Sequence, residues 1–345
     1  MAFRDIYSSN FTEVLIAKPI EKSITWLLEG DPWVRYRTRL DLIQAGENDA
    51  LVEADFNAIL KDKRIKKLFS ELEKWPGKVI KNHSDDKLLL HKLSFLADIG
   101  FTINYKPIQD IVDNVRNFQS KEGPYQVLLN IPKKQGGLGK NEFGWILCDA
   151  PSILYALVKF GLEEDESVQK ALHYLILKVK NNGWGCTASN AIEKKFHGPG
   201  KTTDPCPYSN LLMLKVLAQS KTWKYSSACH KGTDTLLDLW ENSYSKHPFQ
   251  FKMGSDFRKL KAPMIWYDIL HVADVLSQFE WVRNDPRFLD LINIITTKAN
   301  IDSQYTSDSI WEAWENWDFG QINNPSRWLT FLVLRILTRI ENGAI

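Results

Sequence analysis

The sequence lacks an apolar run of about eighteen residues, the length that a membrane-spanning helix requires, so we expect no transmembrane segment. Its first residues, MAFRDIYSSNFTEV, lack the basic and then apolar order of a signal peptide. Only 4 of the 345 residues are cysteines. Their irregular spacing argues against a disulfide framework of the kind that small secreted proteins use. These absences together predict a cytoplasmic protein.

An excess of charge of one sign is also absent. The chain has 44 Lys and Arg against 42 Asp and Glu, a net charge of +2. Nucleic acid is therefore not expected as a partner, because phosphate backbones bind clustered basic side chains and the basic stretch 61–67 stands alone. No Ser/Gly-rich linker or low-complexity tract divides the chain. We expect one domain over residues 1–345, although the length alone would allow two.

What the sequence does contain is a repeat. A pair of apolar helices followed by a turn with an aromatic residue recurs about every sixty residues, with turns at 121–125, 181–185 and 301–305. The first two turns hold a glycine, whereas the turn expected near 240–244 has none. A period of this length indicates one helical unit copied several times, each unable to bury its apolar face alone. The predicted fold class is all-α.

Helical periodicity places the expected elements. Residues 1–80 are expected to form N-terminal helices that cap or close the array, and residues 81–345 the helix pairs. We see no alternating pattern of useful length for a strand. The predicted helices are 24–45 (broken at 31–32), 51–75, 86–99, 108–119, 150–160, 167–180, 209–219, 233–244, 267–279, 285–297 and 326–340.

Aligning the repeats brings acidic residues into register. If Leu157 and Leu276 are equivalent, the residues eight positions earlier are Asp149 and Asp268, with Ser209 in the repeat between them. All three lie at or just before the start of a helix, where an acid is a good N-cap and favours the helix dipole. In a closed array the same helix ends would face one mouth of a central cavity. Both interpretations, a cap and a functional acid, remain open.

The turn Gln119-Ser-Lys-Glu-Gly123-Pro-Tyr125 resembles the Gln-to-Gly-x-Trp turn of the terpenoid cyclase and protein prenyltransferase superfamily, which includes the prenyltransferase and squalene oxidase repeat proteins. That resemblance covers roughly residues 80–340. It implies an α/α toroid, a barrel of antiparallel helix pairs with a repeat of about sixty residues. The segments 148–151, 205–208 and 266–268 also look like those of bacterial and archaeal proteins known only by this repeat. The resemblance therefore implies a fold and names no substrate.

One chemistry of that superfamily starts with a proton from an Asp-x-Asp-Asp box. The similar stretch here is His83-Ser84-Asp85-Asp86, in which His83 replaces the first acid and Asp85 takes the middle position. Asp85 would need a strongly raised pKa to protonate an alkene. The alternative is an ordinary helix cap.

The prenyltransferases hold zinc with Asp, Cys and His from separate repeats. The resemblance implies a zinc ligand set of Cys186, His197 and Cys206, with Cys148-Asp149 as a further source of a ligand. The chain departs from the family pattern because it has no Asp-x-Cys pair. The alternative is buried apolar thiols and a surface histidine.

Aromatic residues are abundant, with 13 tryptophans and 12% Phe, Trp and Tyr. They can pack between repeats or line a cavity for an apolar or cationic ligand. Within 311–319 (WEAWENWDF) a helix would place Trp311, Trp314 and Phe319 on one face. The candidate substrate-binding residues are Trp145, Tyr208, Trp266, Tyr267, Trp311 and Trp314.

These features lead to one preferred function and two alternatives. We expect an enzyme, a cyclase-like lyase or isomerase or a transferase, that acts on an isoprenoid or other apolar small molecule. Its candidate acids are Asp149, Asp268 and Asp85. The same acids could serve a carbohydrate-active α/α-barrel hydrolase or lyase with paired carboxylates. The third hypothesis is a non-catalytic ligand-binding scaffold, since a fold does not fix a function.

Overall fold

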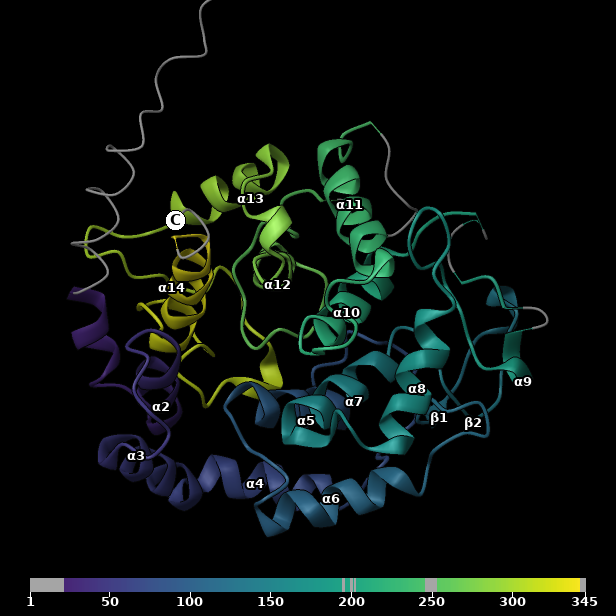
Figure 1. Ribbon diagram of the computed structural model, residues 1–345, viewed down its shortest axis with the longest axis horizontal. Helices are drawn as coiled ribbons and strands as arrows, with labels where there is room; N and C mark the ends of the chain where they lie inside the picture. Colours follow the sequence, from purple (N-terminus) through teal and green to yellow (C-terminus); the bar gives the residue numbers. More distant parts are fainter. Residues whose placement is uncertain (1–21, 194–195, 199–200, 202, 246–252, 342–345) are drawn as a thin grey trace, which may run out of the picture.

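The computed structural model describes residues 22–193, 196–198, 201, 203–245 and 253–341, and this part of the chain is mostly helical (Figure 1). The α-helices are α2 (Pro32–Asp41), α3 (Ala50–Lys61), α4 (Lys63–Leu72), α5 (Leu89–Asp98), α6 (Lys106–Arg116), α7 (Ala150–Leu157), α8 (Glu166–Ile176), α9 (Asn190–Glu193), α10 (Pro207–Leu217), α11 (Ser227–Glu241), α12 (Ile269–Leu276), α13 (Pro286–Thr296) and α14 (Arg327–Glu341). Two strands, β1 (Val127–Leu129) and β2 (Glu142–Gly144), pair antiparallel. Short turns of other helix types occupy Lys133–Gln135, Val158–Leu162, Glu280–Val282 and Glu312–Trp314.

Three local expectations were wrong. The single helix expected over 51–75 is split into α3 and α4 at Asp62, which has an extended backbone and caps α4 by accepting a hydrogen bond from the Arg64 amide at 2.7 Å. The hairpin of β1 and β2 was missed because each strand has only three residues, too few to show alternation. Residues 311–319 form one 3₁₀ turn and further turns instead of a helix, so no helical face aligns their aromatic rings.

The helices form two sets that alternate along the chain (Figure 1). One set comprises α5, α7, α10, α12, α14 and α2, and in that order each helix contacts the next. We call these the inner helices. The helices α3, α8, α11 and α13 each pack against the inner helix that precedes or follows them in sequence. The last helix, α14, contacts α2, so the two ends of the described chain meet.

The repeated turns share one backbone geometry. The amide of residue 123 donates to the carbonyl of 120, that of 183 to 180, and that of 303 to 300. The residue in this position has a positive φ in every case: Gly123 at 125°, Gly183 at 83° and Ser303 at 58°. Ser303 therefore occupies the left-handed conformation that glycine holds in the other two turns. The three turns of the predicted repeat thus share one backbone conformation, and a serine takes the glycine position in the last of them.

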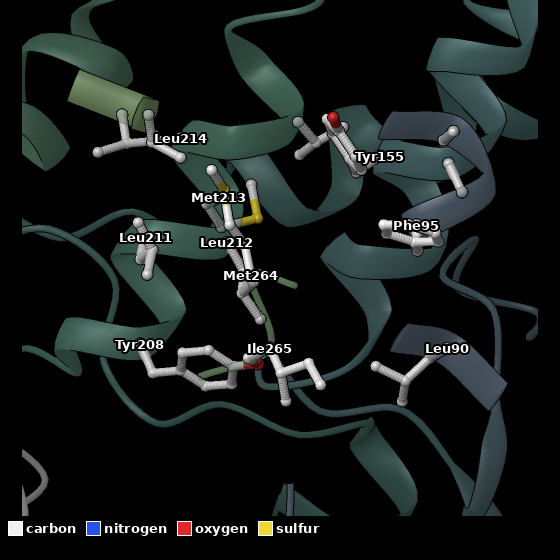
Figure 2. Close-up of a cluster of buried hydrophobic side chains, with 14 of the residues drawn as sticks. Leu90, Phe95, Tyr155, Tyr208, Leu211, Leu212, Met213, Leu214, Met264 and Ile265 are labelled. Carbon is white, nitrogen blue, oxygen red and sulfur yellow. The ribbon is translucent and has the colours of Figure 1, made fainter. Parts of the chain in front are cut away.

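Side chains fill the space between the inner helices. Phe95 of α5 packs edge-on against Trp314 and Trp317, with ring centroids 4.9 Å apart in both pairs, and Trp317 also contacts Trp33 of α2 at 4.7 Å. These rings join the first and last parts of the chain. Figure 2 shows a second cluster, in which Tyr208 and the leucines of α10 lie near Ile265 and side chains of α5 and α7. Most of the aromatic excess is thus used for packing between helices.

A buried ion network lies at the C-terminal halves of the inner helices. Oδ1 of Asp274 on α12 lies 2.7 Å from Nη2 of Arg335 and 3.0 Å from Nη1 of Arg339, both on α14. Lys215 of α10 is only 4% exposed, and its Nζ lies 4.0 Å from Oδ2 of Asp98 at the end of α5. Buried charges are stable only when they are paired. The network therefore ties α5, α10, α12 and α14 together at one end, while the opposite end carries the N-termini of the same helices.

Candidate functional site

Asp149 stands at the N-terminus of α7 but does not cap it. Its side chain makes no capping hydrogen bond. Instead its Oδ1 lies 3.0 Å from Nδ1 of His83, a residue 66 positions earlier in the chain. Asp149 is 1% exposed, and its Oδ2 is buried without a hydrogen-bond partner. A buried carboxylate oxygen without a partner is costly, which marks this atom as a candidate for contact with a ligand or a proton.

The pairing with Asp149 favours the charged form of His83. Burial by itself would lower the pKa of its imidazole, but the charge of Asp149 and the hydrogen bond to it raise the pKa above the ordinary value. The side chain of His83 is 27% exposed, so the pair reaches the surface on the histidine side. His83 is also anchored through its backbone, because its carbonyl lies 3.0 Å from Nε2 of His91 on α5.

Asp268 has the opposite environment at the N-terminus of α12. Its Oδ1 accepts a hydrogen bond from the amide of His271 at 2.9 Å, so this acid is a true N-cap. Its Oδ2 is buried and has no hydrogen-bond partner. Burial raises the pKa of Asp268 to about 7. At neutral pH a large share of Asp268 is therefore protonated and able to donate a proton.

Tyr208 lies within electrostatic reach of both acids. It lies in the first turn of α10, its hydroxyl donates to the carbonyl of Ile265 at 2.8 Å, and its ring stacks at an angle on Trp266 with centroids 4.3 Å apart. Burial raises the pKa of Tyr208, and the negative charges of Asp149 and Asp268 raise it further. Both acids therefore act on the same side chain. Of the residues that the sequence proposed separately, the structure brings Tyr208 and Trp266 into ring contact and places Tyr208 within electrostatic reach of Asp149 and Asp268.

The other expected site residues lie in different surroundings. Asp85 lies before α5 and pairs with the ammonium group of Lys78 at 2.6 Å; the net effect of its surroundings lowers its pKa, the reverse of what alkene protonation needs. Trp145 is fully buried and donates from Nε1 to Glu122 at 2.7 Å. Trp314 is part of the core beside α5, as described above.

Two further aromatic candidates flank the site. Tyr267 is 5% exposed and its ring packs on Phe257, with centroids 5.1 Å apart. Trp311 is half-buried, with the ammonium group of Lys261 5.1 Å above its ring. Lys261 acts electrostatically on Asp268, which places the Trp311 side of the chain near that acid.

The predicted zinc residues do not form a metal site as they stand. Within the ranges that the structure describes, no group of three His, Cys, Asp or Glu side chains is spaced to hold a metal ion. The backbone amide of His197 donates to the carbonyl of Gln135 at 3.2 Å, and the structure records no ion pair or hydrogen bond between its imidazole and a described residue. Cys186 and Cys206 instead interact with Cys148, a residue that the sequence had offered only as a further ligand source.

Sequence reasoning missed the histidine at the start of α12. Nδ1 of His271 lies 2.8 Å from the carbonyl of Trp266, so Nδ1 carries the hydrogen, and Nε2 is left as a buried acceptor without a partner. Burial lowers the pKa of His271 to about 3, and the same holds for His91 at the equivalent third position of α5. The matching segments Leu88-Leu-Leu-His91 and Asp268-Ile-Leu-His271 were the available signal. Both imidazoles are neutral.

Surface hollows occur elsewhere on the described part of the molecule. One hollow of about 800 Å³ lies between α11 and α13 and contains the stacked rings of His230 and Trp281, whose centroids are 4.0 Å apart. Its carboxylates are those of Asp204, Asp234, Asp238 and Asp285. Neither Asp149 nor Asp268 lines it.

No protein-family model matches the chain, and no curated protein is significantly similar to it. Among the described helices none is both long and apolar enough to cross a membrane. The candidate site therefore has to be interpreted from its own chemistry.

Proposed function

We propose that the chain is an α/α toroid of the terpenoid cyclase and protein prenyltransferase type and that it acts as an enzyme on an isoprenoid or other apolar substrate. Three observations support the fold. The inner helices contact one another in sequence, α14 contacts α2, and the turns at Gly123, Gly183 and Ser303 share one hydrogen bond and a positive φ. In such an array the N-termini of α7, α10 and α12 face the same mouth.

The observation that carries the proposed chemistry is the contrast between the two acids. Asp268 is buried, has a pKa of about 7 and keeps Oδ2 free of hydrogen bonds, whereas Asp149 is paired with a histidine whose pKa is raised. A protonated carboxyl group is suited to donate a proton, and a carboxyl group with an unpartnered oxygen beside a histidine is suited to accept one. Asp268 is the proton donor in our proposal, and Asp149 is the proton acceptor.

The reaction that fits is protonation of an unsaturated, apolar substrate. The proton of Asp268 moves to one carbon of a double bond, and the positive charge that develops on the other carbon is stabilised by the faces of Tyr208 and Trp266. Loss of a proton to Oδ2 of Asp149 then ends the reaction as a rearrangement without a change in composition. His83 keeps Asp149 oriented.

The proposal is tested by incubating the purified chain with linear isoprenoid hydrocarbons, alcohols and diphosphates of increasing length and identifying products by gas chromatography and mass spectrometry. Solvent extracts of the freshly purified protein are analysed in parallel for a copurifying apolar molecule. We expect turnover in the wild type and a loss of at least about a hundredfold in Asp268→Asn, the range of general acid catalysis.

The matched control is Asp318→Asn. Asp318 is also a carboxyl group whose pKa is raised by burial and whose Oδ1 lacks a partner, but it caps α14 through the amide of Trp328 at 2.9 Å. Asp318→Asn should keep full turnover. Equal activity in Asp268→Asn and the wild type would remove Asp268 from the reaction.

A carbohydrate-active function has one observation in its favour, the open hollow between α11 and α13, which holds carboxylates beside an aromatic pair. That function would depend on Asp238 in the hollow and not on Asp268. Release of reducing sugar from a panel of oligosaccharides, lost in Asp238→Asn and kept in Asp268→Asn, would establish it in place of the isoprenoid reaction.

A further inference from the structure

Two cysteines of the cluster adjoin a short stretch of backbone pairing. Residues 145–147 run antiparallel to 187–189: Ile146 bridges Ala188, the amide of Leu147 donates to the carbonyl of Thr187 at 3.0 Å, and the amide of Ser189 donates to Trp145 at 2.8 Å. Cys148 follows this stretch in the turn that leads into α7, where the amides of residues 149 and 150 donate to the carbonyl of Ile146, and Cys186 precedes it on the other side. The sulfurs of Cys148 and Cys186 interact with each other.

Two hydrogen bonds fix the third cysteine, Cys206, one through its backbone amide and one through its sulfur. The amide of Cys206 donates to the carbonyl of Trp184 at 2.8 Å, two residues before Cys186. Cys206 is also the N-cap of α10, and its sulfur accepts a hydrogen bond from the amide of Ser209 at 3.5 Å. A helix N-terminus favours the thiolate.

The charges of the three sulfurs differ accordingly. Hydrogen bonds from the thiols of Cys148 and Cys186 lower the pKa of Cys206 far below the ordinary value, and the same interactions raise the pKa of both donors. The sulfurs of Cys148 and Cys186 therefore both lie against that of Cys206. Cys229, the remaining cysteine, is buried outside this cluster, and its pKa is raised to about 11.

We propose that Cys148, Cys186 and Cys206 form a redox-active thiol site that reduces a hydroperoxide and closes a disulfide, with Cys206 as the attacking sulfur. All three cysteines are free thiols in the structure. Cys206 is 4% exposed, but Cys148 and Cys186 are only half-buried, so a small hydroperoxide reaches the cluster from their side. This proposal does not rest on the isoprenoid reaction proposed above, although the cysteines lie close to Asp149 and Tyr208.

The chemistry balances within the cluster. The thiolate of Cys206 attacks one peroxide oxygen, the O–O bond breaks, and the leaving oxygen takes up a proton to give water or an alcohol. Cys206 is then a sulfenic acid. The sulfur of Cys148 or Cys186 attacks it, a disulfide forms, and the hydroxyl leaves as water with the proton of the attacking thiol. Two thiols lose two electrons and the peroxide gains them.

The test treats the full chain, prepared reduced and metal-free, with hydrogen peroxide. Free thiols are then counted after denaturation, and non-reducing peptide mapping identifies the linked residues. We expect the loss of two thiols and a disulfide between Cys206 and either Cys148 or Cys186. Cys206→Ser, which retains an oxygen for the N-cap bond, should slow thiol loss by at least about tenfold because the thiolate is the nucleophile.

Cys229→Ser is the matched control, since it removes a buried cysteine outside the cluster, and its oxidation rate should equal that of the wild type. Separate Cys148→Ala and Cys186→Ala variants identify the resolving thiol. Retention of all four thiols under excess peroxide, or equal reaction of Cys229, would refute the proposal. Tight binding of one zinc ion that is lost in each of the three variants would reassign the cluster to a metal.

Discussion

Oδ1 of Asp149 lies 3.0 Å from Nδ1 of His83, across 66 residues of sequence and from outside its own helix. This pair is the clearest sign that the start of α7 has a purpose other than capping. An aspartate in that position normally accepts from the amides of the first helical turn, and Asp149 does not. Instead its carboxylate pairs with the half-buried imidazole of His83.

The first prediction concerns the charge state of His83. Asp149→Asn should lower the pKa of the His83 imidazole, because the charge that raises it is gone. NMR titration of the histidine ring signals measures this, with His173 on α8 as an internal reference. The raised pKa means that the pair contributes stability fully at low pH and loses it as pH rises through the pKa of folded His83. The stability of the wild type should therefore exceed that of the variant by more at pH 6 than at pH 9.

The second prediction concerns Asp268 and stability. Its pKa of about 7 lies above the ordinary value of 3.8, so the unfolded chain ionises first and the native state loses stability as pH rises between these values. Asp268→Asn keeps an oxygen for the N-cap but does not ionise. Urea unfolding should show the variant more stable than the wild type by up to about 4 kcal/mol at pH 8 and similar to it at pH 4. A variant less stable than the wild type at pH 8 would contradict the assignment.

The third prediction concerns the buried ion network. Asp274→Asn leaves Arg335 and Arg339 without their carboxylate partner and should reduce the free energy of unfolding by about 3 kcal/mol or more at pH 7. The arginines hold the pKa of Asp274 far below its ordinary value. The wild type therefore keeps this stabilisation above the unfolded pKa and loses it as the medium is acidified, whereas the variant has none to lose.

Chemical denaturation at pH 7 and pH 3 tests the third prediction. Asp113→Asn is its control, because the Asp113 side chain is 67% exposed and pairs with Arg116 at 3.4 Å on the surface. Exposed pairs of this kind contribute little. An equal loss in both variants would show that the network is no stronger than a surface contact.

The fourth prediction concerns the repeated turn. Gly183→Ala should destabilise the chain by about 2 kcal/mol or more, because φ is 83° and the added Cβ would lie 2.3 Å from Oδ1 of Asn210. Ser303→Gly should stabilise it or leave it unchanged, by up to about 1 kcal/mol, because Ser303 already has a φ of 58°. Thermal unfolding of the two variants measures both, and a loss of stability in Gly183→Ala alone is the expected result.

The sequence predicted the helical fold well because its signals are local. Periodicity located the helix pairs. Helices α7 and α12 end at Leu157 and Leu276, the residues used to align the repeats, and α10 ends at Leu217, eight residues after Ser209. The N-termini were less regular. Helix α10 starts three residues earlier relative to this alignment, so Cys206 and not Ser209 is its N-cap.

The candidate site could be predicted only in part because its contacts are long-range. Asp149 and Asp268 followed from register, but the partner of Asp149 comes from before α5 and could not be inferred from spacing. The neighbours of the expected zinc residues could not be inferred from spacing either. The antiparallel pairing of 145–147 with 187–189 brings the segments of Cys148 and Cys186 together, and no sequence pattern predicted this pairing.

The contact between α14 and α2 has a consequence for synthesis of the protein. Within the described residues, the carboxylate of Asp274 has ion-pair partners only on α14, at Arg335 and Arg339. A nascent chain that has emerged only through α12 and α13 therefore carries this acid while its partners are still inside the ribosome. The earlier helices can pair locally as they emerge, but the contacts of α14 with α12 and α2 are complete only after translation passes residue 339. Stalled or C-terminally shortened chains should consequently depend on chaperones more than the full-length protein does.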